Sequence, residues 1–417
     1  MGNKFKKIYT IMFFLMPILT PYKSFVPRIT LAELPIFLLI AVFFLLSGGK
    51  WLWDKALFFW FFFLAGMFII QFSFPHPDIT DFLGTTMRYL LTVFLAGCMA
   101  TNCMDFKCAM RTLRVCAFLS SIYLIAQYLI AQLFSIYLPA GFPFLENYTF
   151  REEMYQYVSH ATTLGYRPRS VFGEPAHYCQ YVNLALMTEL YEKAGKGAGR
   201  VVCIAVYCVG ILCSMSLLGV AVMGFIWIQR FFPNLKKKTH TIRGRSVLLV
   251  ALAAIVMILI VPNIPQVQRI IENKFNRAGS VFADERFRTL FSFQIKEYTP
   301  VSFFFGRGMD NPNLEYCVGP LFLFNSFGVM GICAYLFVMF WTWINSDGFA
   351  RRTLEVFTLN CIVGEYLTGI WFALYYSVII SSAQRPSKAY RLPVFERNKN
   401  STPSQSLVIK GTRYEAT

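Results

Sequence analysis

The stretch ALFFWFFFLAGMFIIQFSF, residues 56–74, decides the fold class of this chain. It runs for nineteen residues without a charged side chain, and a helix needs roughly 20 mainly apolar residues to cross a bilayer. The whole chain shares this character, because 56% of its 417 residues are hydrophobic and only 15% are charged. A soluble domain carries about 25% charged residues. The sequence therefore predicts an all-α, polytopic integral membrane protein.

Apolar segments recur along the chain and predict about eleven transmembrane helices, within a range of about 10–12. Short basic loops alternate with them, and the positive-inside rule places these loops and the amino terminus in the cytoplasm. The loops account for the excess of 39 Lys and Arg over 22 Asp and Glu, so no nucleic-acid partner is expected. The predicted spans are residues 8–22, 29–46, 56–74, 82–100, 113–138, 177–190, 201–214, 217–232, 247–261, 320–344 and 356–381.

The carboxyl-terminal end of this scheme contains a conflict. An odd number of spans puts residues 382–417 outside, yet five basic residues lie between positions 385 and 399. Three explanations stay open: segment 356–381 is re-entrant or split near residues 364 and 365, a further span exists, or the tail departs from the rule. We expect one polytopic domain over residues 1–381 and an inside, basic tail over 382–417, whose Ser, Pro and Asn content predicts disorder.

Two long loops are expected on the outer side, at about residues 139–175 and 262–319. Loops of that length in a compact protein are usually functional. Residues 267–293 of the second loop space their apolar side chains at helical intervals, which predicts an amphipathic helix on the bilayer surface or over a cavity. Candidate functional residues are therefore sought in these two loops.

The first outer loop ends in a polar cluster, RPRSVFGEPAHY at residues 167–178. Charged groups at membrane level are costly and usually functional. Pro175 suits the first turn of the next helix, which puts Glu174 at the N-cap, where the helix dipole favours a carboxylate. Arg167 and Arg169 carry planar donor groups that match phosphate oxygens, and neutral His177 or ionised Glu174 can accept a proton from a hydroxyl. The alternative is a salt-bridge network that caps the helix.

The second loop contributes Arg286 and Arg288 within DERFR (284–288), and Gly306 and Gly308 within FGRGMD (305–310). Arg286 is a candidate second anion clamp, and the glycines permit tight turns and close approach of backbone to ligand. A solvated amphipathic face is the alternative for Arg288. Arg88, near the outer end of a predicted span, is expensive there unless it reaches water or a ligand, so it is a further candidate. The four histidines are too dispersed for a zinc site, and neither metal nor cofactor is expected.

These residues resemble the Wzy-type O-antigen and capsular polysaccharide polymerases of the O-antigen ligase/polymerase superfamily. The strongest likeness is RSVFGEPAHYCQY at residues 169–181, which is similar to the family pattern Arg-Ser-x-Phe-x-Glu-Pro-Ala-His. Weaker likenesses are SMSLLG at 214–219, ERF at 285–287, FGRG at 305–308 and NSFGVMG at 325–331. The resemblance covers about residues 169–343, and the carboxyl-terminal quarter departs from it.

The resemblance implies a metal-independent, inverting glycosyl transfer on the outer side of the bacterial cytoplasmic membrane. The donor is then a glycan on undecaprenyl pyrophosphate and the acceptor a sugar hydroxyl on another lipid-linked unit, so that repeat units polymerise into O-antigen, capsular or exopolysaccharide. The departing pyrophosphate needs cations, expected from Arg169, Arg286 and Arg88. His177 is the first choice as base and Glu174 the second, unless Glu174 orients His177. The residues expected to bind substrate are Arg88, Arg167, Tyr181, Arg288, Gly306 and Gly308.

Several alternatives remain at this point. An O-antigen ligase and a protein O-glycosyltransferase belong to the same superfamily. A lipid-linked sugar flippase or other transporter is a separate class, but transporters tend to have inverted repeats and helices broken at the midplane, whereas polar residues gather here in the outer loops. The implied partners are undecaprenyl-pyrophosphate-linked glycans and the lipid bilayer, with a chain-length regulator and a flippase as further candidates.

Overall fold

A computed structural model describes residues 2–25, 29–48, 51–74, 79–142, 145, 166–192, 197–231, 298–309, 319–346, 348–363 and 369–383. Regular structure within these ranges is helical, apart from one isolated antiparallel bridge between Lys23 and Thr30. The prediction of an all-α fold is confirmed. The predicted span 247–261, the amphipathic helix at 267–293 and the tail after Ala383 lie outside the described residues.

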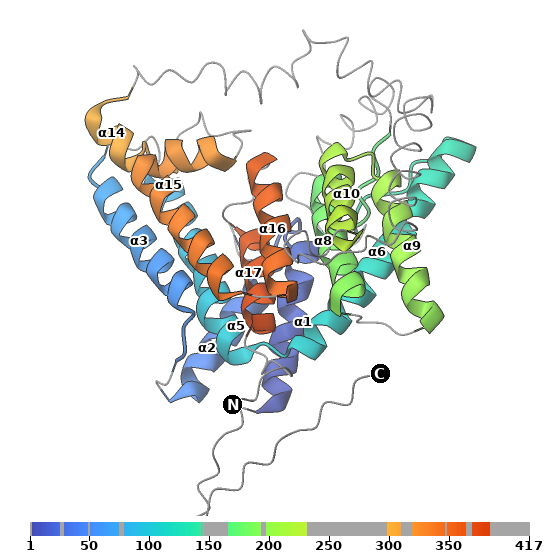
Figure 1. The fold of residues 1–417 in the computed structure, drawn as a ribbon, viewed down its shortest axis with the longest axis horizontal. Helices are drawn as coiled ribbons and strands as arrows, with labels where there is room; N and C mark the ends of the chain where they lie inside the picture. Colours follow the sequence, from blue (N-terminus) through green and yellow to red (C-terminus); the bar gives the residue numbers. More distant parts are fainter. Residues whose placement is uncertain are drawn as a thin grey trace, which may run out of the picture. The chain divides into compact units, whose positions relative to one another are not determined.

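The helices follow one another along the chain as labelled in Figure 1. Two π-helical turns occur in this order. The first, η1 (Leu95–Met99), joins α4 to α5, and the second, η2 (Thr188–Glu192), extends α8. The bounds are α1 (Asn3–Leu19), α2 (Glu33–Ser47), α3 (Lys55–Gln71), α4 (Ile79–Phe94), α5 (Ala100–Cys103), α6 (Phe106–Phe134), α8 (Pro175–Met187), α9 (Gly197–Cys213), α10 (Leu217–Phe231), α14 (Pro300–Phe305), α15 (Gly319–Asn345), α16 (Gly348–Val363) and α17 (Ile370–Ala383).

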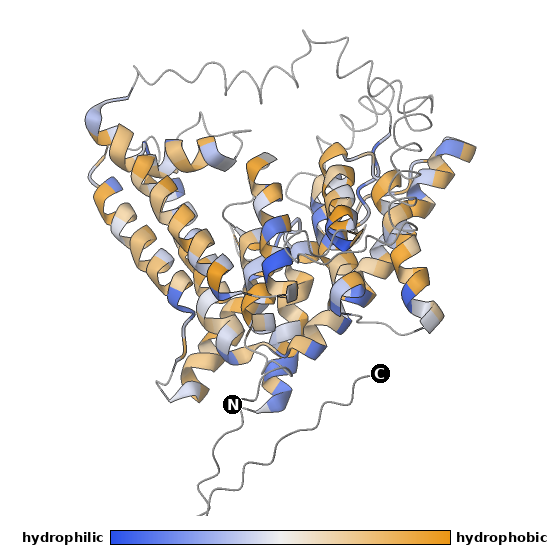
Figure 2. Ribbon diagram, in the orientation of Figure 1, coloured by the Kyte–Doolittle hydropathy of each residue, from blue (hydrophilic) through white to orange (hydrophobic). Residues whose placement is uncertain are grey.

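Three helical segments are long and apolar enough to cross a membrane, namely Ile79–Cys103, Phe106–Phe134 and Gly319–Asn345. Shorter apolar helices include α2, α3, α9, α10 and α17. The colour of hydrophobic residues predominates along α2, α3 and α15 in Figure 2, and exposed apolar side chains on these helices include Leu38, Phe62 and Leu336. The chain is therefore a membrane protein, while the number of about eleven spans stays a prediction.

Basic segments that are far apart in the sequence meet at one end of the helical unit. The rings of Phe106 and Phe349 lie 6.4 Å apart, which joins the starts of α6 and α16. Arg352 Nη1 donates to the carbonyl of Gln229 at 2.7 Å, which adds the end of α10, and α1 packs on α5 and α6. We call this the basic end, because Arg111, Arg230, Arg351 and Arg352 of these helices belong to the basic segments that the positive-inside rule assigns to the cytoplasm.

The predicted single span 356–381 is two helices, α16 and α17, which pack against each other. α16 starts at the basic end. α17 starts at the opposite end, where Trp371 stacks near His177 with ring centroids 5.4 Å apart, and it packs on α5 on its way back. The chain therefore reaches Ala383 at the basic end, which agrees with an inside tail and supports the split that the sequence left open.

The predicted span 320–344 is also not one straight helix. α15 bends at Gly328, whose φ of 64° and ψ of −160° are not helical. We call residues 319–327 the arm; Figure 1 shows it running across the direction of the remaining part, 329–345, before the chain turns. Glycine is required at this bend, since other residues rarely adopt a positive φ.

The arm and α14 cross with their backbones in contact. A Cβ atom at Gly306, which follows α14, would overlap the backbone of Ser326 and Phe327, and one at Gly328 would overlap the backbone of Phe304. The fully buried Gln71 of α3 donates from Nε2 to the carbonyl of Ser326 at 2.5 Å. The same nitrogen donates to the carbonyl of Phe305 at 2.8 Å. Gln71 thus holds both sides of the crossing.

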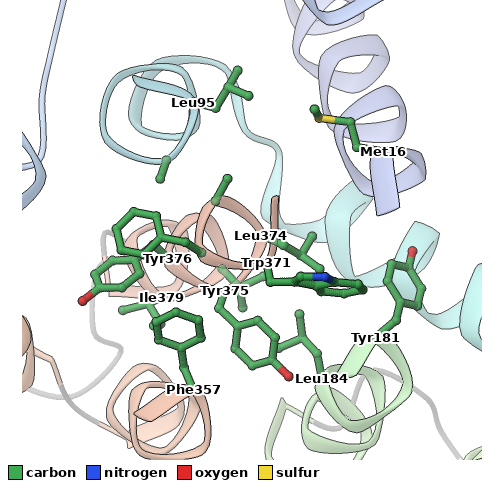
Figure 3. Close-up of a cluster of buried hydrophobic side chains, with 14 of the residues drawn as sticks. Met16, Leu95, Tyr181, Leu184, Phe357, Trp371, Leu374, Tyr375, Tyr376 and Ile379 are labelled. Atoms are coloured by element: carbon green, nitrogen blue, oxygen red, sulfur yellow. The ribbon is translucent and has the colours of Figure 1, made fainter. Parts of the chain in front are cut away.

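The core is built on α17. Every residue from Trp371 to Ser381 is buried, as expected for a helix that is hydrophobic on all sides. Figure 3 shows its aromatic rings meeting Phe357 of α16 on one side and Tyr181 of α8 on the other. The centroid of the Phe357 ring lies 5.3 Å from that of Tyr375. Burial of this helix fixes the position of Trp371, and with it one neighbour of His177.

Candidate functional site

One side chain of α6, Gln127, joins the two ends of the loop at about residues 139–175, which the sequence predicts to face outward. The residue is fully buried, its Nε2 donates to the carbonyl of Pro139 at 2.9 Å, and its Oε1 accepts from the N–H of Ser170 at 2.9 Å. The N–H of Gly141 also donates to the carbonyl of Ser170 at 3.0 Å. Residues 139–142 and 169–172 therefore lie side by side, and we call them the loop neck.

Ser170 is held in an unusual backbone conformation at the neck. Its φ is 56°, which costs a residue with a Cβ atom roughly 1–2 kcal/mol. Its N–H and carbonyl are bonded as described above, and its Oγ donates to the carbonyl of Ser120 at 2.8 Å. These hydrogen bonds offset the strain and fix the direction in which the chain leaves Arg169.

Arg169 is folded into the turn that it begins. It is only 7% exposed, and its Nη1 donates to the carbonyl of Gly173 at 2.6 Å, while its own carbonyl accepts from the N–H of Phe172 at 3.1 Å. The connection between α1 and α2 adjoins the same neck, because the hydroxyl of Tyr22 accepts from the N–H of Phe142 at 2.8 Å. A cation is thus placed rigidly at the end opposite the basic end.

The predicted start of α8 is confirmed. Pro175 is the first helical residue, and Glu174 is the N-cap with extended backbone angles, φ −142° and ψ 156°. The side chain of Glu174 is exposed and makes no capping hydrogen bond. His177 follows within the first turn and is half-buried against Trp371. Residues three apart on a helix are neighbours, so a carboxylate, an imidazole and a guanidinium share this short segment.

Tyr181 does not belong to this surface. It is completely buried, and its hydroxyl donates to the carbonyl of Phe14 in α1 at 2.9 Å. Its ring packs on Phe172, with centroids 5.4 Å apart. The expectation of a substrate contact is corrected to a packing role, because the helix turns this residue toward α1. Arg167, in contrast, is half-buried just before the neck.

Arg88 has a partner within the chain. Its Nε lies 3.3 Å from Oε1 of Glu33 at the start of α2, and its side chain is 53% exposed. The other carboxylate oxygen of Glu33 accepts from the N–H of Thr30 at 2.8 Å. The side chain of Glu33 is only 14% exposed, so the pair is half-buried. The structure therefore explains how an arginine is tolerated here, and a role toward a ligand stays a prediction.

The glycines of the second loop have the conformational freedom that the sequence suggested. The φ angles of Gly306 and Gly308 are 78° and 93°. At Gly306, however, the close approach is to the backbone of the arm and not to an open surface, which corrects the ligand-approach prediction for that residue. The intervening Arg307 stacks on the ring of Tyr298 at 4.0 Å. Arg286 and Arg288 lie outside the described residues.

The serine-rich turn at residues 214–216 is a packing element for α8. Ser214 Oγ lies 3.0 Å from the thiol of Cys179, and the N–H of Gly219 donates to Ser216 Oγ at 3.3 Å, as at a helix N-cap. A Cβ at Gly219 would overlap the side chain of Cys179. This motif therefore stabilises the helix that carries His177 and does not itself form the polar surface.

Two residues that position the site were missed in the sequence. Gln127 and Gln132 are the two amides of the apolar helix α6. Amide side chains in membrane helices usually form hydrogen bonds between segments, so the sequence carries a signal, but it does not say which of the two makes them. Trp371 has no comparable signal, because aromatic residues are common throughout the chain. Within the ranges that the structure describes, no three His, Cys, Asp or Glu side chains come together as metal ligands.

Comparison of the chain with protein-family models and with curated protein sequences found no match. The resemblance to polysaccharide polymerases therefore depends on the motifs quoted above. The surface formed by the loop neck and the first turn of α8 is the basis for a functional proposal.

Proposed function

We propose that this membrane protein is a glycosyltransferase that joins undecaprenyl-pyrophosphate-linked oligosaccharide units into a polysaccharide on the outer side of the bacterial cytoplasmic membrane. The observation that carries the proposal is the placement of Arg169 at the loop neck, where its Nη1 donates to the carbonyl of Gly173, the residue before Glu174 at the start of α8. A cation beside an acid–base pair suits a reaction in which an anionic group leaves and a hydroxyl attacks.

Each group has a defined task in this mechanism. The guanidinium of Arg169, with its plane fixed by the carbonyl of Gly173, stabilises the negative charge that grows on the departing pyrophosphate. His177 accepts the proton of the acceptor hydroxyl while that oxygen bonds to the anomeric carbon. The bond from this carbon to the pyrophosphate oxygen breaks, and the lipid pyrophosphate leaves as the anion. Glu174 stabilises the imidazolium that forms.

Arg286 and Arg88 are the further cations that we assign to the pyrophosphate. The side chain of Arg88 is 53% exposed although that of its partner Glu33 is only 14% exposed, so the guanidinium can reach a phosphate from its open side. Arg286 is supported by its motif in the second outer loop alone. Both assignments are secondary to that of Arg169, and the proposal does not depend on them.

The acceptor distinguishes the proposed polymerase from its relatives. An O-antigen ligase or a protein O-glycosyltransferase uses the same cation and base with a different acceptor. A transporter is favoured by one feature only, the break of α15 at Gly328, because broken helices often form transport sites. Here the chain's own α14 backbone fills the break, so the feature has a packing explanation.

The proposal is tested by deleting the gene, complementing with variants and separating surface glycans by gel electrophoresis. We expect Arg169→Ala to leave single repeat units in place of long chains at an unchanged amount of membrane-inserted protein. Arg111→Ala is the matched control, because it removes an exposed arginine at the basic end of α6. Long chains from Arg169→Ala contradict the proposal. Reconstitution with a lipid-linked repeat unit as the only acceptor separates polymerase from ligase and protein glycosylation.

A further inference from the structure

A groove of about 410 Å³ runs between α15 and α16, away from the loop neck. Its wall on α15 includes Ile332, Met339 and Trp343, and its wall on α16 includes Leu354, Thr358 and Cys361. These residues recur at intervals of three, four and seven, which places them on one face of each helix. The volume lies within the range of about 300–1,000 Å³ that is typical of ligand pockets.

The groove has two different ends. At its outer end it is lined by Pro320 and Leu323 of the arm, which turns across α15 at Gly328. At its other end lies Trp343, and the guanidinium of Arg351 stacks on this indole at 4.6 Å. Arg351 precedes Leu354 and Thr358 by three and seven residues, so it continues the same face of α16. The groove is therefore covered by apolar residues at one end and has a cation at the basic end.

Arg351 and its neighbour Arg352 are placed differently. Arg352 points to α10, where its Nη1 donates to the carbonyl of Gln229. Arg351 is held over the indole of Trp343 by a bond of 3.0 Å from its Nε to the carbonyl of Ser346. The one carboxylate in the groove lining, that of Glu355, accepts from Gln229 Nε2 at 2.7 Å, which draws it toward α10. Of the two arginines, Arg351 is the one that stacks on a residue of the groove lining, Trp343, which places its guanidinium beside the groove at the basic end.

The length of the groove matches one leaflet of a bilayer. From Ile332 to Trp343 the helix rises about 16 Å at about 1.5 Å per residue, and half of a hydrocarbon core of about 30 Å is about 15 Å. Leu336 at the groove edge is 60% exposed, and Phe340 beside it 62%. These exposed side chains mark the open side of the groove, which we place toward lipid.

We infer that the groove binds an anionic phospholipid of the cytoplasmic leaflet, with one acyl chain between α15 and α16 and its phosphate at Arg351. A guanidinium beside an apolar groove between membrane helices is a suitable site for an acidic headgroup. The lipid bridges α15, which forms the crossing with α14, and α16, which packs on the central helix α17. This site is separate from the proposed transfer reaction, whose lipid substrates are on the other leaflet.

The test uses the full chain purified in neutral detergent, with phosphatidylglycerol and phosphatidylcholine as probes. Bound lipid is counted by native mass spectrometry, and the shift in unfolding temperature is followed during lipid titration. Arg351→Gln removes the cation, with Arg111→Gln as the matched control. Leu336→Trp obstructs the groove from an exposed position, and Leu119→Trp is its control because Leu119 of α6 is 61% exposed. Size-exclusion elution identifies variants that fail to fold.

We expect Arg351→Gln to weaken phosphatidylglycerol binding by about five- to tenfold, the effect of one arginine near a phosphate surface, while phosphatidylcholine binding stays unchanged. Leu336→Trp is expected to reduce the bound count of both lipids. Equal binding of phosphatidylglycerol to the two glutamine variants, or equal binding of the two lipids by the unmodified chain, overturns the inference. Unchanged lipid binding in Leu336→Trp overturns the assignment to this groove.

Discussion

Replacement of Gln127 by methionine is expected to open the loop neck without unfolding the helices. Methionine has a similar length but forms neither of the hydrogen bonds that the amide makes to Pro139 and Ser170. An unpaired buried backbone group costs about 1–3 kcal/mol. Loss of the hydrogen bond to the N–H of Ser170 alone therefore predicts that the equilibrium constant for local opening of the neck at Ser170 increases roughly 5- to 150-fold.

Hydrogen–deuterium exchange measured by mass spectrometry detects this opening. Peptides that cover residues 139–142 and 166–172 report on the N–H groups of Gly141 and Ser170, which are bonded within the neck. Exchange in these peptides is expected to accelerate, while exchange in α17 stays slow because that helix is buried along its length. If Arg169 acts on substrate as proposed, chain growth falls in the same variant because the guanidinium loses its fixed position.

The matched control is Gln132→Met. Gln132 lies on the same helix but is exposed, so its replacement removes an amide without breaking the neck. Equal exchange rates at the neck in the two variants refute the clamp assigned to Gln127. Faster exchange throughout α6 and α17 also refutes it, because the effect is then global unfolding.

Three further predictions concern stability and are measured by thermal unfolding in detergent. Gly328→Ala is expected to destabilise the protein by more than about 1–2 kcal/mol, the cost of positive φ alone, because its Cβ also overlaps the backbone of Phe304. The control is Gly224→Ala, whose Cβ meets nothing within 4 Å and which should be neutral or stabilising by up to about 1 kcal/mol. Equal effects of the two substitutions disprove the crossing. Arg114→Met should cost about 3–5 kcal/mol, because it removes the guanidinium whose Nε lies 2.9 Å from the buried carboxylate of Glu189. A loss below about 1 kcal/mol is inconsistent with a stabilising role of that pair. Asp54 caps α3 by accepting from Ala56 N at 3.0 Å, so Asp54→Ala should cost about 1 kcal/mol and Asp54→Asn much less. Burial raises the pKa of Asp54, so the folded state holds the proton of this carboxyl more tightly than the unfolded chain does. The contribution of Asp54 to stability should therefore increase as pH falls through the raised pKa and be lost as pH rises through it. This contribution must be absent in Asp54→Asn.

The helix start at the site could be predicted because its signals are local. Proline at the first helical position and an acidic residue before it are properties of a few neighbouring residues, and the structure places Pro175 and Glu174 accordingly. Tyr181 belongs to the same motif, but the motif does not show that its side chain is buried. Only the packing of α1 against α8 decides that its hydroxyl meets the carbonyl of Phe14.

The helix count near the carboxyl terminus shows the limit of hydropathy. Residues 356–381 are mostly apolar, and the polar residues near 364 and 365 are compatible with a split as well as with a re-entrant segment. Composition therefore does not distinguish these possibilities from the antiparallel pair α16 and α17. The basic tail indicated that something was missing, since the positive-inside rule constrains the number of crossings. The bend at Gly328 gave less warning, because a single glycine within an apolar segment is tolerated in a membrane helix.

By itself, the sequence determined that this is a helical membrane protein, where its basic segments are, and where α8 begins. These properties follow from composition, charge and short-range signals, each of which acts within about one helix length. Tertiary structure alone decided that Gln127 joins the two sides of the loop neck, that Gly306 meets the arm, and that Arg351 lies beside a groove. These contacts join residues that are distant in the chain, and their free energy depends on geometry that exists only once the helices have packed.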